Sequence, residues 1–186
     1  MKSICICAKI CSMMAWKAIR GQVNGFLCGD SYWGSRLGGD EAEDGARRGI
    51  HLAVLVEPFL EYILEGRKTV ESRFSIRRVA PFDRVDSGDI VLLKRSCGPI
   101  VGLCEVSDVW FYHLDPASWL EIREDYGRAL CIEDPEFWRT RQHTSFATLM
   151  RLQHTRELPP VPFPKRDRRG WVVLRRRLPK PLEEEG

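Results

Sequence analysis

Gly66-Arg67-Lys68-Thr69-Val70-Glu71-Ser72-Arg73-Phe74 is the stretch on which the fold of this 186-residue chain depends. Before it, residues 59–64 place apolar side chains at helical spacing, and a glycine such as Gly66 commonly ends a helix. From Thr69 onward, polar and apolar side chains alternate as they do in a β-strand. We therefore predict a helix, a glycine turn and a strand whose two faces are formed by Val70, Ser72 and Phe74 on one side and Thr69, Glu71 and Arg73 on the other.

The flanking sequence supplies further short elements. The apolar run 51–56 suits a buried strand, and turns at 86–89 and 97–99 each lead into strands, at 90–93 and 100–112. Asp115-Pro116 and Asp134-Pro135 place a capping acid before a proline, which predicts helices over about 116–126 and 135–142. Closing strands are expected within 146–157 and 170–177. The pattern predicts an α+β fold, a small closed β-barrel with two to three peripheral helices.

The N-terminal quarter of the chain differs from the rest. Residues 1–49 show no strand alternation, and 34–49 are glycine-rich and acidic, so we predict a poorly ordered N-terminal extension. The domain is expected over residues 50–178, followed by a C-terminal tail at 179–186. An alternative is an organellar transit peptide within residues 1–30, because a weakly amphipathic helix fits 8–20 and no acidic residue precedes Asp30.

Overall composition indicates a soluble protein. Hydrophobic residues make up 44% and charged residues 30% of the chain, and no apolar run approaches the roughly 18 residues of a membrane span. The seven cysteines are an odd number, and with no secretory h-region they favour a reducing, cytoplasmic location over a disulfide framework. Cys5, Cys7 and Cys11 lack further ligands at zinc spacing, so neither a metal nor a cofactor is predicted. The sequence leaves the oligomeric state open.

Positive charge is concentrated in two segments, 73–84 and 165–177, although the net charge is only +3. A fold that brought these segments together would create a cationic face, which is typical of a protein that binds a polyanion. The alternative is an ordinary solvated surface. The predicted phosphate contacts come from both segments and are Arg77, Arg78, Lys165, Arg166, Arg168 and Arg169.

The opening stretch also carries the predicted site. Lys68 lies at the start of the strand, and Glu71 and Arg73 share one face of it, where they would offer both acceptors and donors to a polar ligand. The alternative is a plain polar outer face over a core of Val70 and Phe74. The remaining predicted ligand-binding residues lie beside this strand or at the ends of others, and are Gly66, Thr69, Lys94 and Ser145.

The motif Gly-x-Lys-Thr-x-Glu-x-Arg at 66–73, the Ser87-Gly-Asp-Ile90 turn and the Val101–Val106 strand together resemble the ASCH family, the activating signal cointegrator homology domains. The resemblance spans about residues 51–174. It implies a PUA-like β-barrel with a cleft between the barrel and the first helix, where Lys68, Glu71 and Arg73 would meet. It also implies RNA or a nucleotide as the ligand.

One bacterial branch with a similar motif hydrolyses the acetyl amide of acetylcytidine, using the motif lysine and a threonine three residues later. Lys68 matches that lysine, whereas Glu71 stands where that branch has threonine. We therefore predict binding of RNA or a nucleotide. The alternative is a hydrolase, an amidohydrolase or ribonuclease-type enzyme, in which Lys68 and Glu71 would be the catalytic residues.

Overall fold

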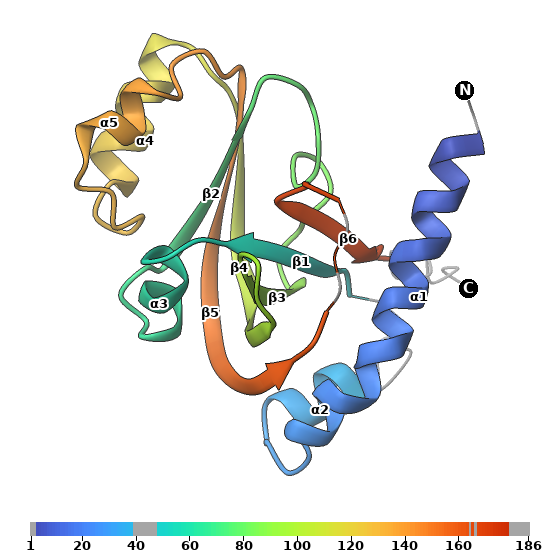
Figure 1. The fold of residues 1–186 in the computed structure, drawn as a ribbon. Helices are drawn as coiled ribbons and strands as arrows, with labels where there is room; N and C mark the ends of the chain where they lie inside the picture. The colour runs from blue at the N-terminus through green and yellow to red at the C-terminus, as the bar shows by residue number, and fades with distance from the viewer. Residues whose placement is uncertain (1–2, 39–47, 164, 166, 179–186) are drawn as a thin grey trace, which may run out of the picture.

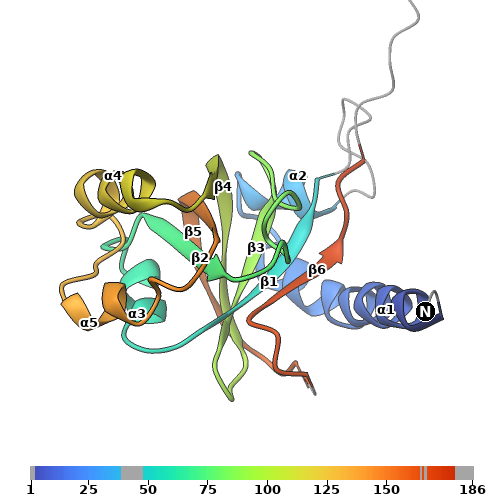
Figure 2. The ribbon, with the colours of Figure 1, turned by 90° about the horizontal axis from the view of Figure 1, so that it is seen from above.

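A computed structural model describes residues 3–38, 48–163, 165 and 167–178, and it confirms the predicted α+β class. A six-stranded mixed sheet curls around itself, with helices on both of its sides (Figures 1 and 2). In the order β2-β5-β4-β3-β1-β6, only β1 and β3 are parallel neighbours. The strands are β1 Ile50–Leu55, β2 Val70–Ser75, β3 Ile90–Arg95, β4 Ile100–His113, β5 Phe146–Val161 and β6 Trp171–Arg175.

Three helices connect the strands, and two of them begin at the predicted capping acids. Helix α3 spans Phe59–Leu64, α4 spans Pro116–Tyr126 and α5 spans Pro135–Arg139. The carboxylate of Asp115 accepts a hydrogen bond from the Ser118 amide, and that of Asp134 accepts one from the Glu136 amide. Each acid therefore satisfies an amide in the first turn of a helix that begins with proline.

The curled sheet has a seam, because its two edge strands, β2 and β6, do not pair along the part of the chain that the structure describes. The Arg73 side chain of β2 reaches across this gap. Its guanidinium donates hydrogen bonds to the carbonyl oxygens of Gly170 at 3.2 Å and Val54 at 3.1 Å. An arginine side chain thus joins edges that a fully closed barrel would join by a backbone ladder.

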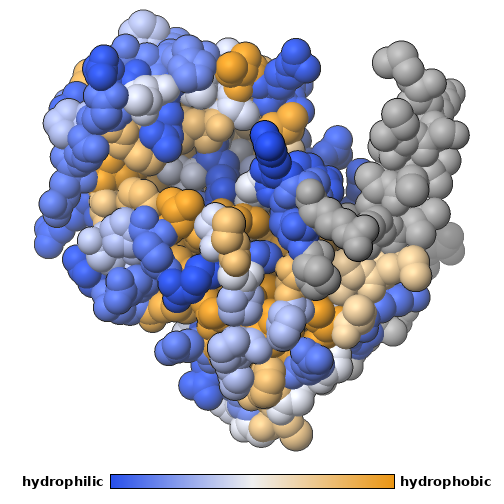
Figure 3. Space-filling model, in the orientation of Figure 1, coloured by the Kyte–Doolittle hydropathy of each residue, from blue (hydrophilic) through white to orange (hydrophobic). Residues whose placement is uncertain are grey.

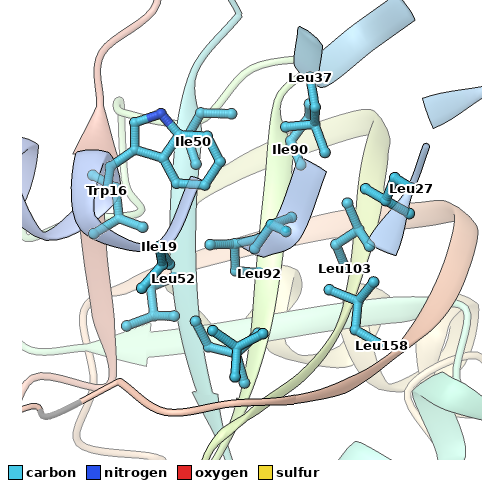
Figure 4. Close-up of a cluster of buried hydrophobic side chains, with 14 of the residues drawn as sticks. Trp16, Ile19, Leu27, Leu37, Ile50, Leu52, Ile90, Leu92, Leu103 and Leu158 are labelled. Carbon is cyan, nitrogen blue, oxygen red and sulfur yellow. The ribbon is translucent and has the colours of Figure 1, made fainter. Parts of the chain in front are cut away.

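The outer face of the sheet is covered by two helices from the N-terminal segment, α1 Ser3–Phe26 and α2 Trp33–Gly38 (Figure 2). Figure 4 shows their apolar side chains directed at those of the strands, with Trp16 and Ile19 beside Ile50 and Leu52. Val23, one helical turn beyond Ile19, is also fully buried. Residues 3–38 therefore differ from the poorly ordered extension expected for 1–49, because apolar positions at helical spacing dock on the strands.

The other side of the sheet carries the helices that position the site. Helix α3 packs into the interior of the curl through Leu60 and Ile63, whereas Val70 of β2 packs under α4 and α5 with Ile122 and Trp138. The two faces of β2 are thus assigned as the alternation predicts. Val70 lies under the helices, and Glu71 faces the interior of the curl, where its charge acts on the thiol of Cys104.

A buried ionic network holds the turn before β3. The Asp89 carboxylate accepts hydrogen bonds from the Gly49 and Asp86 amides, from His51 and from Arg177. The other ring nitrogen of His51, Nδ1, accepts from the indole N–H of Trp171 at 3.2 Å. Because an indole N–H only donates, Nδ1 of His51 is an acceptor here, and Nε2 is the nitrogen that faces Asp89.

Two of the sequence predictions concern residues that the structure does not describe. The C-terminal tail at 179–186 and Arg166 lie outside the described residues. Among the helices that are described, none is both long and apolar enough to cross a membrane.

Candidate functional site

A cleft of about 290 Å³ lies at the seam of the sheet. Its walls come from the end of β1 and the chain beyond it, from the first residue of α3, from β2, and from the segment around α5. The residues that line it are Val54, Leu55, Val56, Phe59, Lys68, Glu71, Ser72, Arg73, Phe74, Ile132, Phe137 and Arg141. The cleft thus lies between the curled sheet and α3, where the resemblance places the family's site.

Lys68 forms the floor of this cleft and is only 4% exposed. Its ammonium group donates to the carbonyl oxygens of Val70 at 2.6 Å and Leu130 at 3.1 Å, and lies 3.4 Å from Oε2 of Glu71. Burial lowers the pKa of Lys68 below its ordinary value, and the charge of Glu71 opposes that shift. All three ammonium protons have an acceptor nearby, so Lys68 acts here as a fixed positive charge.

Glu71 joins the two cations of the floor. Its Oε2 faces Lys68, and its Oε1 lies 2.9 Å from Nε of Arg73. That distance marks an ion pair, but the Nε–H of Arg73 is not aimed at the oxygen, and this buried nitrogen has no hydrogen-bond acceptor among the described residues. An unsatisfied buried donor costs about 1–3 kcal/mol. The network is therefore incomplete on the side of Arg73.

Aromatic side chains and a further cation form the upper walls. Phe59 and Phe137 meet edge to face with their ring centroids 6.2 Å apart. The guanidinium of Arg141 lies 3.6 Å above the Phe137 ring and donates to the Phe137 carbonyl. No acidic partner of Arg141 is found among the described residues. The cleft therefore holds three cations, Lys68, Arg73 and Arg141, against the single carboxylate of Glu71.

The surface view agrees with this composition. On the face drawn in Figure 3, hydrophobic residues lie between α3 and the α4–α5 pair, and hydrophilic residues border them on both sides. A ligand that fits must combine a flat apolar body with negative charge.

The predicted ligand-binding residues do not all meet in the cleft. Lys68, Glu71 and Arg73 do. Gly66, with a φ of +75°, forms the turn after α3, and Thr69 is exposed; neither lines the cleft.

Two further candidates lie elsewhere. Lys94 is buried beneath the β3–β4 turn, where its ammonium donates to the carbonyls of Arg95 and Gly98, and burial lowers its pKa. Ser145 is exposed beside Ser75, whose carbonyl accepts from the Ser145 amide.

Some of the predicted phosphate contacts form ion pairs with carboxylates of the protein, and others are exposed. Lys165 and Arg169 both bind the Asp167 carboxylate, at 2.6 and 2.8 Å, and Arg78 pairs with Asp83. Arg77 and Arg168 are exposed. The basic segments approach each other where Arg73 contacts Gly170.

The residues of the cleft that were not predicted from the sequence include its two aromatic walls and its third cation, namely Phe59, Phe137 and Arg141. The sequence favoured Phe59 and Phe137 as parts of helices. Arg141 follows α5 in an otherwise unremarked polar stretch, and only the packing of α5 against α3 brings it over the cleft. No local pattern separates it from the neighbouring, exposed Arg139.

Two comparisons with known proteins find the ASCH domain. The family model of the ASCH domain matches residues 54–155, which include β2 to β4, the first part of β5 and the residues that line the cleft. Among solved structures, a serine-to-alanine variant of the ASCH protein from Zymomonas mobilis is 17% identical, with a TM-score of 0.56 over 69% of this chain and 89% of that chain. ASCH from Zymomonas mobilis itself is 17% identical, covering 60% and 72%, with a TM-score of 0.49. No curated protein matches the sequence.

Proposed function

This chain belongs to the ASCH domain family, and on that premise we propose that it binds RNA or a free nucleotide in the cleft floored by Lys68, Glu71 and Arg73. The observation that carries the proposal is the composition of the cleft. An ionic floor with surplus positive charge lies under aromatic walls, at the seam of the sheet.

A nucleotide has the two properties that this cleft requires. Its base is flat and stacks on aromatic rings or on a guanidinium plane, so Phe59, Phe137 and Arg141 can hold it. Its phosphate is an anion, which matches the excess of three cations over one carboxylate. The Glu71 carboxylate can also accept from the amino group of a base, because neither cation occupies all of its lone pairs.

The contacts of Lys68 favour binding over hydrolysis. A lysine can accept a proton from a reacting group only in its neutral form, and then its single lone pair must face the substrate. Here two main-chain carbonyls and Glu71 hold the ammonium form, although burial lowers the pKa of Lys68. We therefore assign Lys68 an electrostatic role in which it orients Glu71.

The proposal is tested by titrating the full chain with the four nucleoside monophosphates and with short single-stranded RNA, followed by calorimetry at two salt concentrations. Binding should weaken as salt rises, because cations meet phosphate. Replacing Arg141 by glutamine should weaken binding about tenfold, a loss of about 1.4 kcal/mol that is typical of a charged hydrogen bond.

The matched control is Arg139→Gln, two residues earlier, whose side chain pairs with Glu136 outside the cleft. It should leave monophosphate affinity, which depends on the cleft alone, unchanged. The proposal would be contradicted if none of these ligands bound. It would also be contradicted if Arg141→Gln and Arg139→Gln lost affinity equally.

A further inference from the structure

We infer that the ligand continues from the cleft into a second cavity beside it, so that the protein takes two successive nucleotides of a single strand. Arg141 then lies beneath the phosphate that joins them. This inference rests on the proposed function and specifies its ligand class as single-stranded RNA of at least dinucleotide length.

The second cavity is larger than the first and adjoins it. Its volume is about 760 Å³, and it extends between α3, the α4–α5 connection and α5. Phe59, Ile132, Phe137 and Arg141 line both cavities, so they form the ridge between them. Ligand pockets commonly measure about 300–1,000 Å³. The cleft alone is therefore at the lower limit for one nucleotide, and the two cavities together leave room for a longer ligand.

The walls of the second cavity repeat the chemistry of the ridge. The guanidinium of Arg67 lies 4.0 Å above the Tyr62 ring, just as that of Arg141 lies 3.6 Å above the Phe137 ring. Each pair presents a flat, cationic surface, and bases of single-stranded RNA stack on arginine planes of this kind. A double helix would keep its bases stacked inside, so the geometry points to a single strand.

The charges of the second cavity leave cations available for phosphate. Asp134 caps α5 and Glu136 pairs with Arg139, so these two acids are occupied. Arg128 is exposed, and it has no side-chain partner among the described residues. Glu133, also exposed, remains as an acceptor for a base amino group. Arg67 pairs with Glu65, so Arg128 and Arg141 are the two cations of the groove without a carboxylate partner among the described residues.

The position of Arg128 is set by the site itself. It belongs to the connection 127–132, whose Ala129 carbonyl accepts from the amides of Thr69 and Val70, and whose Leu130 carbonyl accepts from Lys68. The connection is therefore fastened to the start of β2, directly beside the floor of the cleft. This anchoring gives the second cavity a fixed place relative to the first.

The experiment compares each nucleoside monophosphate with the corresponding 5′-phosphorylated dinucleotide by calorimetry on the full chain. We expect the dinucleotide to bind at least tenfold more tightly. Replacing Arg128 by glutamine should remove most of that gain and change monophosphate affinity less than twofold. Arg123→Gln, an exposed arginine on α4 that lines neither cavity, is the control and should change neither affinity.

The outcomes separate the two proposals. If no monophosphate and no dinucleotide binds, the proposed function fails. If monophosphates bind and dinucleotides bind no better, the proposed function stands and the second subsite is excluded. Equal losses of both affinities in Arg128→Gln would also exclude it, because Arg128 would then act on the cleft itself.

Discussion

Two ionic networks are buried in this protein, and they differ in whether their hydrogen bonds are complete. Around Asp89, two amides, a histidine and an arginine satisfy both carboxylate oxygens, and the carboxylate is 1% exposed. Around Glu71, the Arg73 Nε–H lacks an acceptor, and the network forms the floor of a cleft. The Asp89 network lines neither of the two cavities described here.

This difference suggests that the Asp89 network serves the stability of the fold and the Glu71 network serves ligand binding. A buried charge is tolerated when surrounding groups replace the hydrogen bonds that it made with water. Asp89 meets this condition entirely within the protein, and it joins the ends of β1, β3 and β6. Glu71 and its neighbours meet it only in part, and they line a cleft in which a ligand can contact Glu71 and the guanidinium of Arg73. We expect substitutions in the first network to affect stability and those in the second to affect affinity.

The largest effect is expected for Asp89→Asn. The amide keeps the shape of the side chain but removes the charge that faces Arg177 and cannot accept on both sides. The free energy of unfolding should fall by about 3–5 kcal/mol, as for other broken buried pairs, measured by urea denaturation. Nucleotide affinity of the folded protein should stay within twofold of wild type.

The control for this variant is Asp108→Asn, since Asp108 is an exposed acid paired with Arg151 on the surface. It should cost less than about 1 kcal/mol. A large loss of affinity in folded Asp89→Asn would show that the two networks are not independent.

A smaller effect on stability is expected for Glu71→Gln. Lys68 would lose its acidic neighbour but keep the carbonyls of Val70 and Leu130. Unfolding free energy should therefore fall by about 1–3 kcal/mol, while nucleotide affinity drops at least tenfold. Glu124→Gln is the matched control, because Glu124 is exposed on α4 and lines neither cavity. Unchanged affinity in Glu71→Gln would remove Glu71 from the site.

At acid pH, the difference in the free energy of unfolding between wild type and Asp89→Asn should become smaller. Burial alone would raise the pKa of Asp89, but the hydrogen bond from His51 and the charge of Arg177 outweigh burial and lower it. A carboxylate with a lowered pKa contributes stability above its unfolded pKa of about 3.9, and that contribution is lost as the pH falls through the folded pKa. Denaturation of both proteins between pH 7 and pH 3 measures it, and a constant difference would argue against a lowered pKa of Asp89.

The smallest effect is expected for Thr69→Val, inside the same motif as Lys68 and Glu71. Thr69 is exposed and lines neither cavity, and its contacts are made by its backbone. Stability should change by less than about 0.5 kcal/mol, and affinity should not change. Calorimetry that detected a loss of affinity would place the threonine hydroxyl in contact with the ligand.

Local sequence predicted most of the elements, because their signals are short-range. The alternation in β2, the glycine after α3 and the acid-proline pairs before α4 and α5 each depend on a few neighbouring residues. The family motif added the prediction that Lys68, Glu71 and Arg73 share a cleft, and the structure brings these three together.

The docking of the N-terminal helices on the sheet was not predicted from the sequence, for a physical reason. Helix α1 is only weakly amphipathic, and isolated helices gain most of their stability from packing. Trp16, Ile19 and Val23 acquire their role only when the strands offer an apolar face (Figure 4).

The sequence by itself determined the helices and strands around β2 and the polar face of that strand, because those depend on periodicity and on caps. Only the tertiary structure decided that Arg73 bridges the seam and that Lys94 donates hydrogen bonds to carbonyls of the β3–β4 turn. It alone placed Arg141 above the cleft, 68 residues beyond Arg73 in the chain. Contacts between segments so far apart arise from how the sheet curls and where α5 packs, and no local pattern encodes them.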